Sequence, residues 1–440
     1  MNPHDKPFEP VREHECDVLV IGGGSAGIGA SVAAARSGAK TVLIEQTCCL
    51  GGNGTAGMVP ALAPFNYNQK DGEPYLRGVA WEVVERLDAA DGLFGMGKHQ
   101  WWKLFDKEIA KGVFEKLLME AGVKIRYFTF FHTVEMDGPM IKRVFTVSKS
   151  GLESWRAKVY VDTSGDADVA ASAGAPIMMG DVKSERMPPT YCFTVMNVDR
   201  ALLGDARNVN EAMKRGKAEG RLRNPDDHRG EKDIFGPHAM VFNYNHVYDV
   251  DCLNADDLTH GVIEGREIAF ELLAYLRDTV PGFKSADIST TGILLGVRET
   301  RRIRGDFVLE TPAYFESQRH EDDIGVYDYA LDLHAAQASK DSQEGYYDIY
   351  YDKRTGPGEF FGIPYRCLLP QGVENLAVAG RCISCDRPML GSIRQLSSSM
   401  VMGQAAGTAG ALALKKGTRY RDISVPGLQD TLRKDGAYIP

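Results

Sequence analysis

Several features that define other protein classes are missing from this sequence. No uninterrupted apolar run approaches the roughly 20 residues that a membrane-spanning helix needs, and segment 1–16 is polar, with no apolar run of signal-peptide length. Eight cysteines in 440 residues are too few for a disulfide framework. Most of these thiols are therefore expected to be buried. From these absences we expect a cytoplasmic protein that has no contact with a membrane.

Positive charge is also in short supply. The chain has 51 Lys and Arg against 60 Asp and Glu, which gives a formal net charge of -9 and a sequence pI of about 5.7. Because nucleic acids attract basic surfaces, no nucleic-acid partner is expected. With 43% hydrophobic residues and 25% charged residues, the composition is typical of a folded protein of two or three domains.

Metal-binding patterns are absent as well. His238 and His246 are isolated in the sequence, and there is no H-x-x-x-H motif and no paired C-x-x-C motif. The sequence therefore predicts no metal site.

Near the start of the chain, a glycine-rich turn separates two apolar segments. Residues 17–21 (DVLVI) have the β-branched composition of a buried strand, and they lead into a turn at 22–27 (GGGSAG). Small residues follow as far as residue 36, and a second apolar strand over 40–44 ends at Glu45. A G-x-G-x-x-G turn between strand and helix, with an acid after the next strand, predicts a dinucleotide-binding unit.

Each part of this turn has a physical task. Gly22 permits the tight turn, Gly24 lets the backbone approach a pyrophosphate, and Gly27 lets the helix lie close to the strand. Ser25 and Ala26 begin the helix, whose free N–H groups and positive dipole end favour phosphates. Glu45 would accept hydrogen bonds from a ribose diol.

The segment after Glu45 favours FAD over NAD. Residues 48–57 (CCLGGNGTAG) hold four glycines in seven positions, which fits neither a regular helix nor a strand. Such a loop suits a cofactor that continues beyond its adenosine, with Gly51, Gly52, Asn53 and Thr55 as contacts. A flexible surface loop is the alternative.

At this point the sequence resembles the FAD-dependent oxidoreductase family that is related to the glutathione-reductase and succinate-dehydrogenase flavoproteins. The resemblance recurs at 159–170 (VYVDTSGDADVA), 363–384 (IPYRCLLPQGVENLAVAGRCIS) and 391–410. It implies one FAD, and we expect this FAD to be bound non-covalently because no S-H-x-x-A-type segment for a histidyl linkage is present. The further contacts that the resemblance implies are the backbone near Val134 for the adenine, and Gly165, Gly380, Arg381, Leu396 and Ser397 for the rest of the cofactor.

The predicted fold is α/β. We expect a discontinuous Rossmann-type FAD-binding domain made of 1–60, 100–180 and 360–440, and a connecting or cap segment at 61–99. Residues 181–359 would form an inserted, mainly β, mixed α+β substrate domain. No second G-x-G-x-x-G follows a strand there, so a stably bound nicotinamide is not expected.

Candidate catalytic residues lie in a run of arginines at 298–304 (RETRRIR). Because guanidinium groups bind carboxylates through two parallel hydrogen bonds, Arg298 and Arg301 could hold an acidic substrate, with Glu299 orienting one of them. The family resemblance adds Arg394, facing the isoalloxazine. An exposed, ion-paired face is the alternative interpretation.

One further pair of residues carries two interpretations. Cys382 and Cys385 form a C-x-x-C beside the expected cofactor segment. They could be a redox dithiol, but structural thiols are favoured, because redox pairs of this spacing normally lie at the start of a helix.

The leading functional prediction is hydride transfer between FAD and a small organic molecule, which could bear a carboxylate. One alternative is a flavin-carrying redox subunit that passes electrons to a partner protein, although the iron–sulfur cysteine runs of such subunits are absent. A second is a flavin-dependent RNA-modifying enzyme, which the acidic composition disfavours. The sequence leaves a homo-oligomer open.

Overall fold

A mixed β-sheet forms the centre of the computed structural model, which describes residues 9–62, 74–94, 103–180, 185–204, 207–224, 239–243, 246–336 and 358–440. The strand order is β5-β2-β1-β8-β7-β6, and β16 also pairs with β8. The parallel neighbours are β1 (Arg12–Ile21), β2 (Thr41–Ile44), β5 (Lys124–Arg126), β8 (Gly151–Asp162) and β16 (Leu376–Val378). The carboxyl ends of β1, β2, β8 and β16 therefore meet at one edge of the sheet.

The long strand β8 joins two parts of this sheet. Its first half pairs with β7 (Met140–Ser148), which in turn pairs with β6 (Phe130–Asp137), and both pairings are antiparallel. Its second half pairs with β16. Strands β6, β7 and β8 thus form a β-meander with turns near residues 138 and 150.

Both faces of the central strand are buried, as in sheets covered on two sides. Val18 and Val20 belong to the core shared with the helices α1 (Ser25–Arg36) and α11 (Leu396–Lys416). Leu19 and Ile21 face a second core, which contains Trp155 and Tyr160. The continuous apolar run at 17–21 follows from this double burial.

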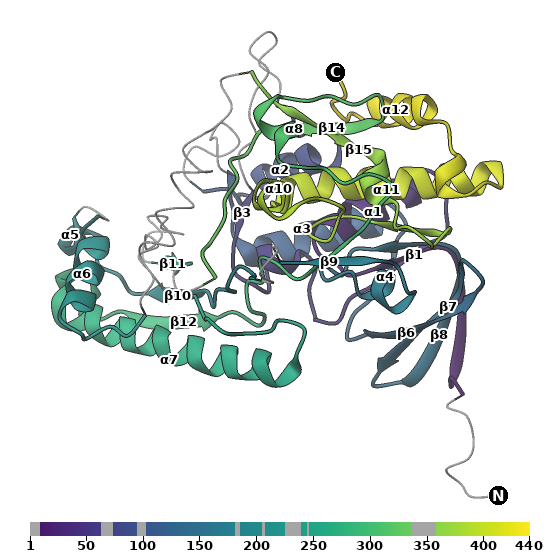
Figure 1. Cartoon of the computed structure of the whole chain (residues 1–440). Coiled ribbons are helices and arrows are strands. Elements are labelled where there is room, and N and C mark those ends of the chain that lie inside the picture. Colours follow the sequence, from purple (N-terminus) through teal and green to yellow (C-terminus); the bar gives the residue numbers. More distant parts are fainter. Residues whose placement is uncertain are drawn as a thin grey trace, which may run out of the picture.

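Helices α1 (Ser25–Arg36) and α11 (Leu396–Lys416) lie side by side over the sheet (Figure 1). Their backbones are in direct contact, because a Cβ atom added to Gly29 would collide with the carbonyl oxygen of Met400. Cβ atoms added to Gly403 and Gly407 would likewise collide with the carbonyl oxygens of Ala26 and Ala30. The small residues of the 403–410 segment thus allow the close packing that their composition predicts.

Shorter elements complete this part of the molecule. The helices are α2 (Val79–Ala89), α3 (Lys107–Glu120), α4 (Asp168–Ser172), α8 (Pro312–Phe315), α10 (Arg387–Ile393) and α12 (Val425–Lys434). Three two-stranded sheets pair β3 (Ala61–Leu62) with β4 (Lys103–Leu104), β9 (Ile177–Met179) with β13 (Arg301–Ile303), and β14 (Asp323–Tyr327) with β15 (Phe361–Pro364).

A separate group of elements lies to the left of the main sheet in Figure 1. It has an antiparallel sheet in the order β11-β10-β12 and three helices, and its buried side chains form a core of their own around Phe193, Phe242 and Leu272. The elements are α5 (Arg200–Leu203), α6 (Arg207–Ala218), α7 (Ala255–Thr279), β10 (Phe193–Met196), β11 (Met240–Phe242) and β12 (Asp287–Thr291). All of them fall within 181–359. The expected boundaries near residues 100 and 181, and much of segment 61–99, lie outside the described residues.

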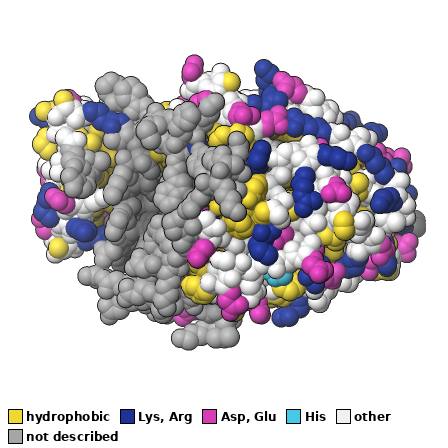
Figure 2. Space-filling model, turned by 90° about the horizontal axis from the view of Figure 1, so that it is seen from above, with side chains coloured by type: hydrophobic (Ala, Val, Ile, Leu, Met, Phe, Trp, Pro, Cys, Tyr) yellow, Lys and Arg dark blue, Asp and Glu magenta, His cyan; other side chains and the backbone are white. Residues whose placement is uncertain are grey.

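The surface shows no large area of one charge on the face in Figure 2, where basic and acidic side chains are interspersed. Within the described part of the chain, no helix is long and apolar enough to cross a membrane.

The contact between α1 and α11 predicts how two glycine substitutions differ. Gly407→Ala forces a methyl group against Ala30 and should lower the free energy of unfolding by about 1–3 kcal/mol. The matched control is Gly112→Ala in α3, where an added Cβ meets no atom within 4 Å; it should be neutral or stabilise by up to about 1 kcal/mol. Urea unfolding of both variants measures the difference, and equal stability would contradict the close packing.

Candidate cofactor site

A cavity of about 320 Å³ opens at the edge where the parallel strands end. Its wall includes the residues that directly follow β1, β2, β8 and β16, namely Gly22, Glu45, Thr163 and Ala379. In open α/β sheets, ligands bind outside the carboxyl ends of the strands. The cavity is therefore the candidate site for a cofactor.

The turn before α1 presents backbone to this cavity. Gly22 has a φ of 104°, which favours glycine, and a Cβ there would lie 2.5 Å from the carbonyl oxygen of Thr163. Gly24, Ser25 and Ala26 line the cavity, and a Cβ added to Gly24 would meet no atom within 4 Å. No side chain caps the N-terminus of α1, so its first N–H groups remain for a ligand.

Gly27 has a structural role and does not contact the cavity. It is not among the lining residues, and a Cβ there would collide with the carbonyl oxygen of Gly22. Its task is the close approach of α1 to β1.

Glu45 is fixed at the cavity wall. Its Oε2 accepts a hydrogen bond from Gly23 N at 2.7 Å, and its Oε1 accepts hydrogen bonds from Thr47 N at 2.7 Å and Thr47 Oγ1 at 2.8 Å. The side chain lies where the second strand ends, which is the position that a ribose-binding acid occupies in dinucleotide folds.

The glycine loop after Glu45 also reaches the cavity. Gly51 (φ 105°) and Gly52 (φ 53°) line it together with Asn53, whose Nδ2 donates to Val297 O at 3.1 Å. Thr55 is not a lining residue, because its hydroxyl turns back and donates to Leu50 O.

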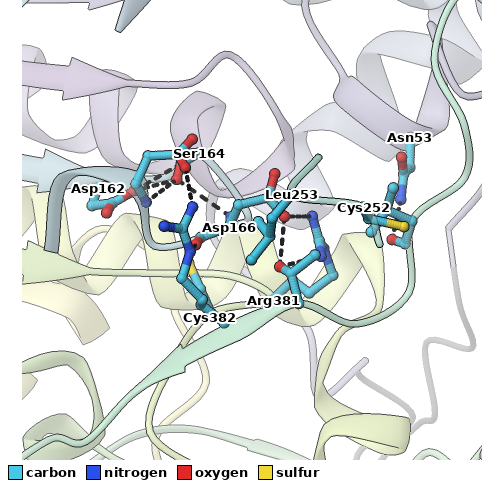
Figure 3. A network of polar contacts seen from close by, with 12 residues as sticks. Asn53, Asp162, Ser164, Asp166, Cys252, Leu253, Arg381 and Cys382 are labelled. Atoms are coloured by element: carbon cyan, nitrogen blue, oxygen red, sulfur yellow. Dashed lines mark hydrogen bonds and ion pairs between the residues drawn. The ribbon is translucent and has the colours of Figure 1, made fainter. Parts of the chain in front are cut away.

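The turn after β8 is held by a network of polar contacts (Figure 3). The buried carboxylate of Asp162 accepts hydrogen bonds from Ser164 N, Ser164 Oγ, Val169 N and Ala170 N. Asp166 Oδ1 accepts from Arg381 Nη2 at 2.8 Å and from Thr300 Oγ1 at 2.6 Å. Arg381 and Gly165 line the cavity, so this network fixes the wall at that point.

Asp168 is a further lining residue of this turn. Burial raises its pKa to about 6, and repulsion from Asp162 and Asp166 adds to the shift, although Arg301 and Arg381 oppose it.

The N-terminus of α11 supplies the opposite part of the wall through Leu396 and Ser399, and no side chain caps it. Ser397 is buried outside the lining. Arg394, just before this helix, also lines the cavity, and its Nη2 donates to Asp332 O at 3.0 Å and Asp332 Oδ2 at 3.1 Å. The Nε of Arg394 is buried and has no partner among the described residues. It is thus a donor available to a ligand.

Arg298 and Arg301 lie behind this wall and are not lining residues. Arg298 Nη1 donates to Pro188 O at 3.0 Å and to Thr190 Oγ1. Burial lowers the pKa of Arg298 to about 10, and the nearby charge of Arg394 adds to the shift. Arg301 donates to Asp166 O at 2.7 Å and pairs with Asp168.

The expectation that Glu299 orients Arg298 or Arg301 is wrong. Its carboxylate does not orient Arg298 or Arg301; Oε1 accepts from Arg302 Nη1 at 2.8 Å, and Oε2 accepts from Arg387 Nε at 3.1 Å and Met187 N at 3.0 Å. Glu299 and Arg302 are both buried, where an ionised group needs a partner of opposite charge. The 298–304 run is therefore no exposed ion-paired face at these positions.

Other residues that line the cavity belong to no motif in the sequence. Thr129 and Phe131 lie at the wall where Val134 was expected, while the backbone N–H of Val134 faces Ser172 Oγ at 3.3 Å. A further part of the wall comes from Cys252, Leu258, Leu294, Leu295 and Val297. Cys252 lies in the loop before α7, Leu258 lies in the first turn of α7, and the other three residues follow β12.

The C-x-x-C cysteines do not form a disulfide and are both buried. Burial raises the pKa of both thiols, to about 12 for Cys385. Because the thiolate is the reactive form, these raised pKa values favour structural thiols over a redox pair.

Histidine 246 is not isolated in space. Its Nε2 lies 3.1 Å from Nδ1 of His334, and both rings are buried. In the described ranges, no group of three or more His, Cys, Asp or Glu side chains has metal-binding geometry.

These features fit FAD. Two uncapped helix N-termini, an open space in front of Gly24 and the fixed carboxylate of Glu45 suit a pyrophosphate and a ribose. The orphaned donor of Arg394 fits an anion or a carbonyl oxygen at the α11 end.

The open space at Gly24 yields a prediction. Gly24→Ala places a methyl group in the cavity without touching protein, so the stability of the FAD-free protein should not change. FAD affinity should fall by roughly tenfold or more, which corresponds to about 1.4 kcal/mol. Equilibrium titration with FAD and thermal unfolding of the FAD-free protein measure the two effects, with Gly112→Ala as the control. Unchanged FAD affinity would contradict binding of the FAD phosphates at this turn.

Comparisons with known proteins extend these observations. A geranylgeranyl bacteriochlorophyll reductase-like protein from Thermoplasma acidophilum aligns at 12% identity and a TM-score of 0.44, over 96% of this chain and 83% of the other. The p-nitrophenol 4-monooxygenase from Pseudomonas putida DLL-E4 aligns at 14% identity and a TM-score of 0.44, over 96% and 84%. The sequence pattern of a known family, described as FAD dependent oxidoreductase, matches residues 17–432. The chain therefore belongs to the FAD-dependent oxidoreductase family.

Proposed function

We propose that this enzyme transfers a hydride between non-covalently bound FAD and a small organic substrate that bears a carboxylate. When bound, FAD supplies the two-electron acceptor or donor. The protein's own residues hold the cofactor and orient the substrate.

The proposed FAD contacts follow the cavity wall. Gly22, Gly24, Ser25 and Ala26 would meet the pyrophosphate, and Glu45 the ribose of the adenosine. Gly51, Gly52, Asn53, Gly165, Gly380, Arg381 and Leu396 would contact the remainder of the cofactor, and Thr129 and Phe131 lie nearest the position proposed for the adenine. Gly27, Thr55, Val134 and Ser397 stand behind the wall and would support it.

The substrate carboxylate is inferred from an excess of positive charge near the N-terminus of α11. Arg298 and Arg394 are close enough that the charge of Arg394 lowers the pKa of Arg298. Among the described residues, Arg298 donates to the neutral oxygen atoms of Pro188 and Thr190, and Asp332 is the carboxylate that pairs with Arg394. The buried Arg298 and the partly buried Arg394 beside one carboxylate favour an anionic ligand, since unpaired charge away from water is costly. This charge imbalance is the observation that carries the proposal.

The domain organisation is part of the same proposal. The strands of the main sheet come from 1–60, 100–180 and 360–440, and the β11-β10-β12 group has its own core within 181–359. A substrate domain inserted into a discontinuous FAD domain would bring Leu294, Leu295 and Val297 to the cofactor cavity.

A charge-removing substitution tests the carboxylate. Small mono- and dicarboxylic acids, with 2-hydroxy acids among them, should perturb or bleach the visible flavin absorption, and their neutral amides should not. Arg394→Gln should weaken binding of the active acid about 10- to 100-fold, because a hydrogen bond to a charged group contributes about 1.5–3 kcal/mol. Arg304→Gln is the matched control, since Arg304 is exposed. Equal binding of acids and amides, or an Arg394→Gln affinity within twofold of the original, would contradict the proposal.

A further inference from the structure

Three carboxylates lie close together at the turn after β8. They belong to Asp162, Asp166 and Asp168, and the last two line the cofactor cavity. This turn packs directly against the glycine turn before α1, because Thr163 Oγ1 donates to Gly22 O at 2.7 Å. A diphosphate held at the N-terminus of α1 would therefore lie beside carboxylates, whose negative charge repels it.

Two of the three carboxylates are occupied by donors. Each oxygen of Asp162 accepts two hydrogen bonds from the turn and the start of α4, so a proton on this buried group would face no acceptor. Asp166 Oδ1 accepts from Arg381 Nη2 at 2.8 Å and from Thr300 Oγ1 at 2.6 Å. Hydrogen bonds of this kind favour the ionised form of a carboxylate.

Asp168 differs from both in its partners and its exposure. Among the described residues its carboxylate pairs with Arg301, and 37% of its side chain is exposed at the cavity wall. Burial raises the pKa of Asp168 to about 6, and repulsion from Asp162 and Asp166 adds to the shift. A bound diphosphate would cover this side chain and add negative charge, and both effects would raise the pKa further.

The other ionisable groups of this region do not compete for the proton. Around Asp168 and its arginine partners lie Asp162 at the end of β8, Asp166 in the turn, Arg301 on β13, Arg381 after β16, and Asp251 and Cys252 in the loop before α7, where Asp251 pairs with Arg186. Burial raises the pKa of Cys252 to about 11, so its thiol stays neutral at neutral pH. Strand β6 contacts α4 through Thr133 and Ser172, and its histidine, His132, is exposed.

We propose that Asp168 is a further contact of the FAD diphosphate and binds it as a neutral carboxylic acid, so that FAD binding takes up a proton from water. The inference rests on the proposed position of the diphosphate at the Gly24 turn. An O–H bond forms on Asp168, and no other covalent bond changes. The neutral acid can donate a hydrogen bond to a phosphate oxygen, which a carboxylate cannot do. Arg301 and Arg381 then balance the charge of the diphosphate in place of that of Asp168.

The inference fixes the sign of the pH dependence. FAD raises the proton affinity of Asp168, so protonation raises the affinity for FAD by the same factor. FAD affinity should therefore be highest and constant below about pH 6, where Asp168 is protonated with or without FAD. It should fall as the pH rises above this value, by about tenfold for each unit by which FAD raises the pKa of Asp168.

Titration of the FAD-free, full-length protein with oxidised FAD tests this inference without turnover. Flavin fluorescence gives the affinity between about pH 5.5 and pH 8.5, and we expect a fall of about tenfold or more over this range. Calorimetry at about pH 7 in two buffers of different ionisation enthalpy should show uptake of a fraction of a proton per FAD bound. This second measurement needs no variant, and absence of uptake overturns the inference.

Two variants locate the proton. Asp168→Asn keeps a hydrogen-bond donor but cannot titrate, so its FAD affinity should be independent of pH and about tenfold tighter than that of the original protein at about pH 8.5. A residue with a merely structural role would not tighten binding when it is replaced. His132→Gln is the control, because histidine ordinarily titrates in this pH range, and it should leave the pH dependence unchanged.

The Gly24→Ala variant separates this inference from the position of the diphosphate. FAD binding that Gly24→Ala weakens, but that does not depend on pH or keeps its pH dependence in Asp168→Asn, overturns the role of Asp168 alone. FAD binding that Gly24→Ala does not weaken overturns the position of the diphosphate and this inference with it.

Discussion

The cofactor site depends on the backbone contact between α1 and α11. These helices come from opposite ends of the chain, and Gly29, Gly403 and Gly407 remove the side chains that would hold them apart. Their close packing brings two uncapped N-termini to the same cavity, one at Gly24 and the other at Gln395. Positive dipole ends and free N–H groups at two points suit a ligand that carries negative charge along its length.

Electrostatics divides the remaining surroundings of the cavity into two parts. Near the β8 turn, each arginine has a carboxylate partner, since Arg381 and Arg301 pair with Asp166 and Asp168. Near α11 this is not so, because Asp332 pairs with Arg394, whereas Arg298 donates to the neutral oxygen atoms of Pro188 and Thr190. The ion pairs near the β8 turn stabilise the cavity wall. Near α11, a bound substrate anion would offset the cost of keeping two positive charges away from water.

Local sequence patterns predicted the parts of the site that a single turn or helix determines. The strand–turn–helix at 17–36 and the acid at Glu45 depend on neighbouring residues, and the structure has these elements where they were expected. The contacts of Glu299 with Arg387 and Met187, and the contact between His246 and His334, join segments 88 to 112 residues apart. No periodicity or spacing encodes such contacts, because tertiary packing alone decides which buried charges meet. Composition favoured arginine as a ligand for anions, but it could not distinguish Arg302, which is bound internally, from Arg394.

The most direct test of the account is the visible absorption spectrum of the purified protein, followed by acid precipitation and identification of the released flavin. The account predicts a flavin spectrum of the protein, about one FAD per chain in the supernatant and a colourless pellet. Yellow colour retained in the pellet would contradict non-covalent binding. A colourless protein that does not take up added FAD would contradict the central claim that the cavity between α1 and α11 is a flavin site.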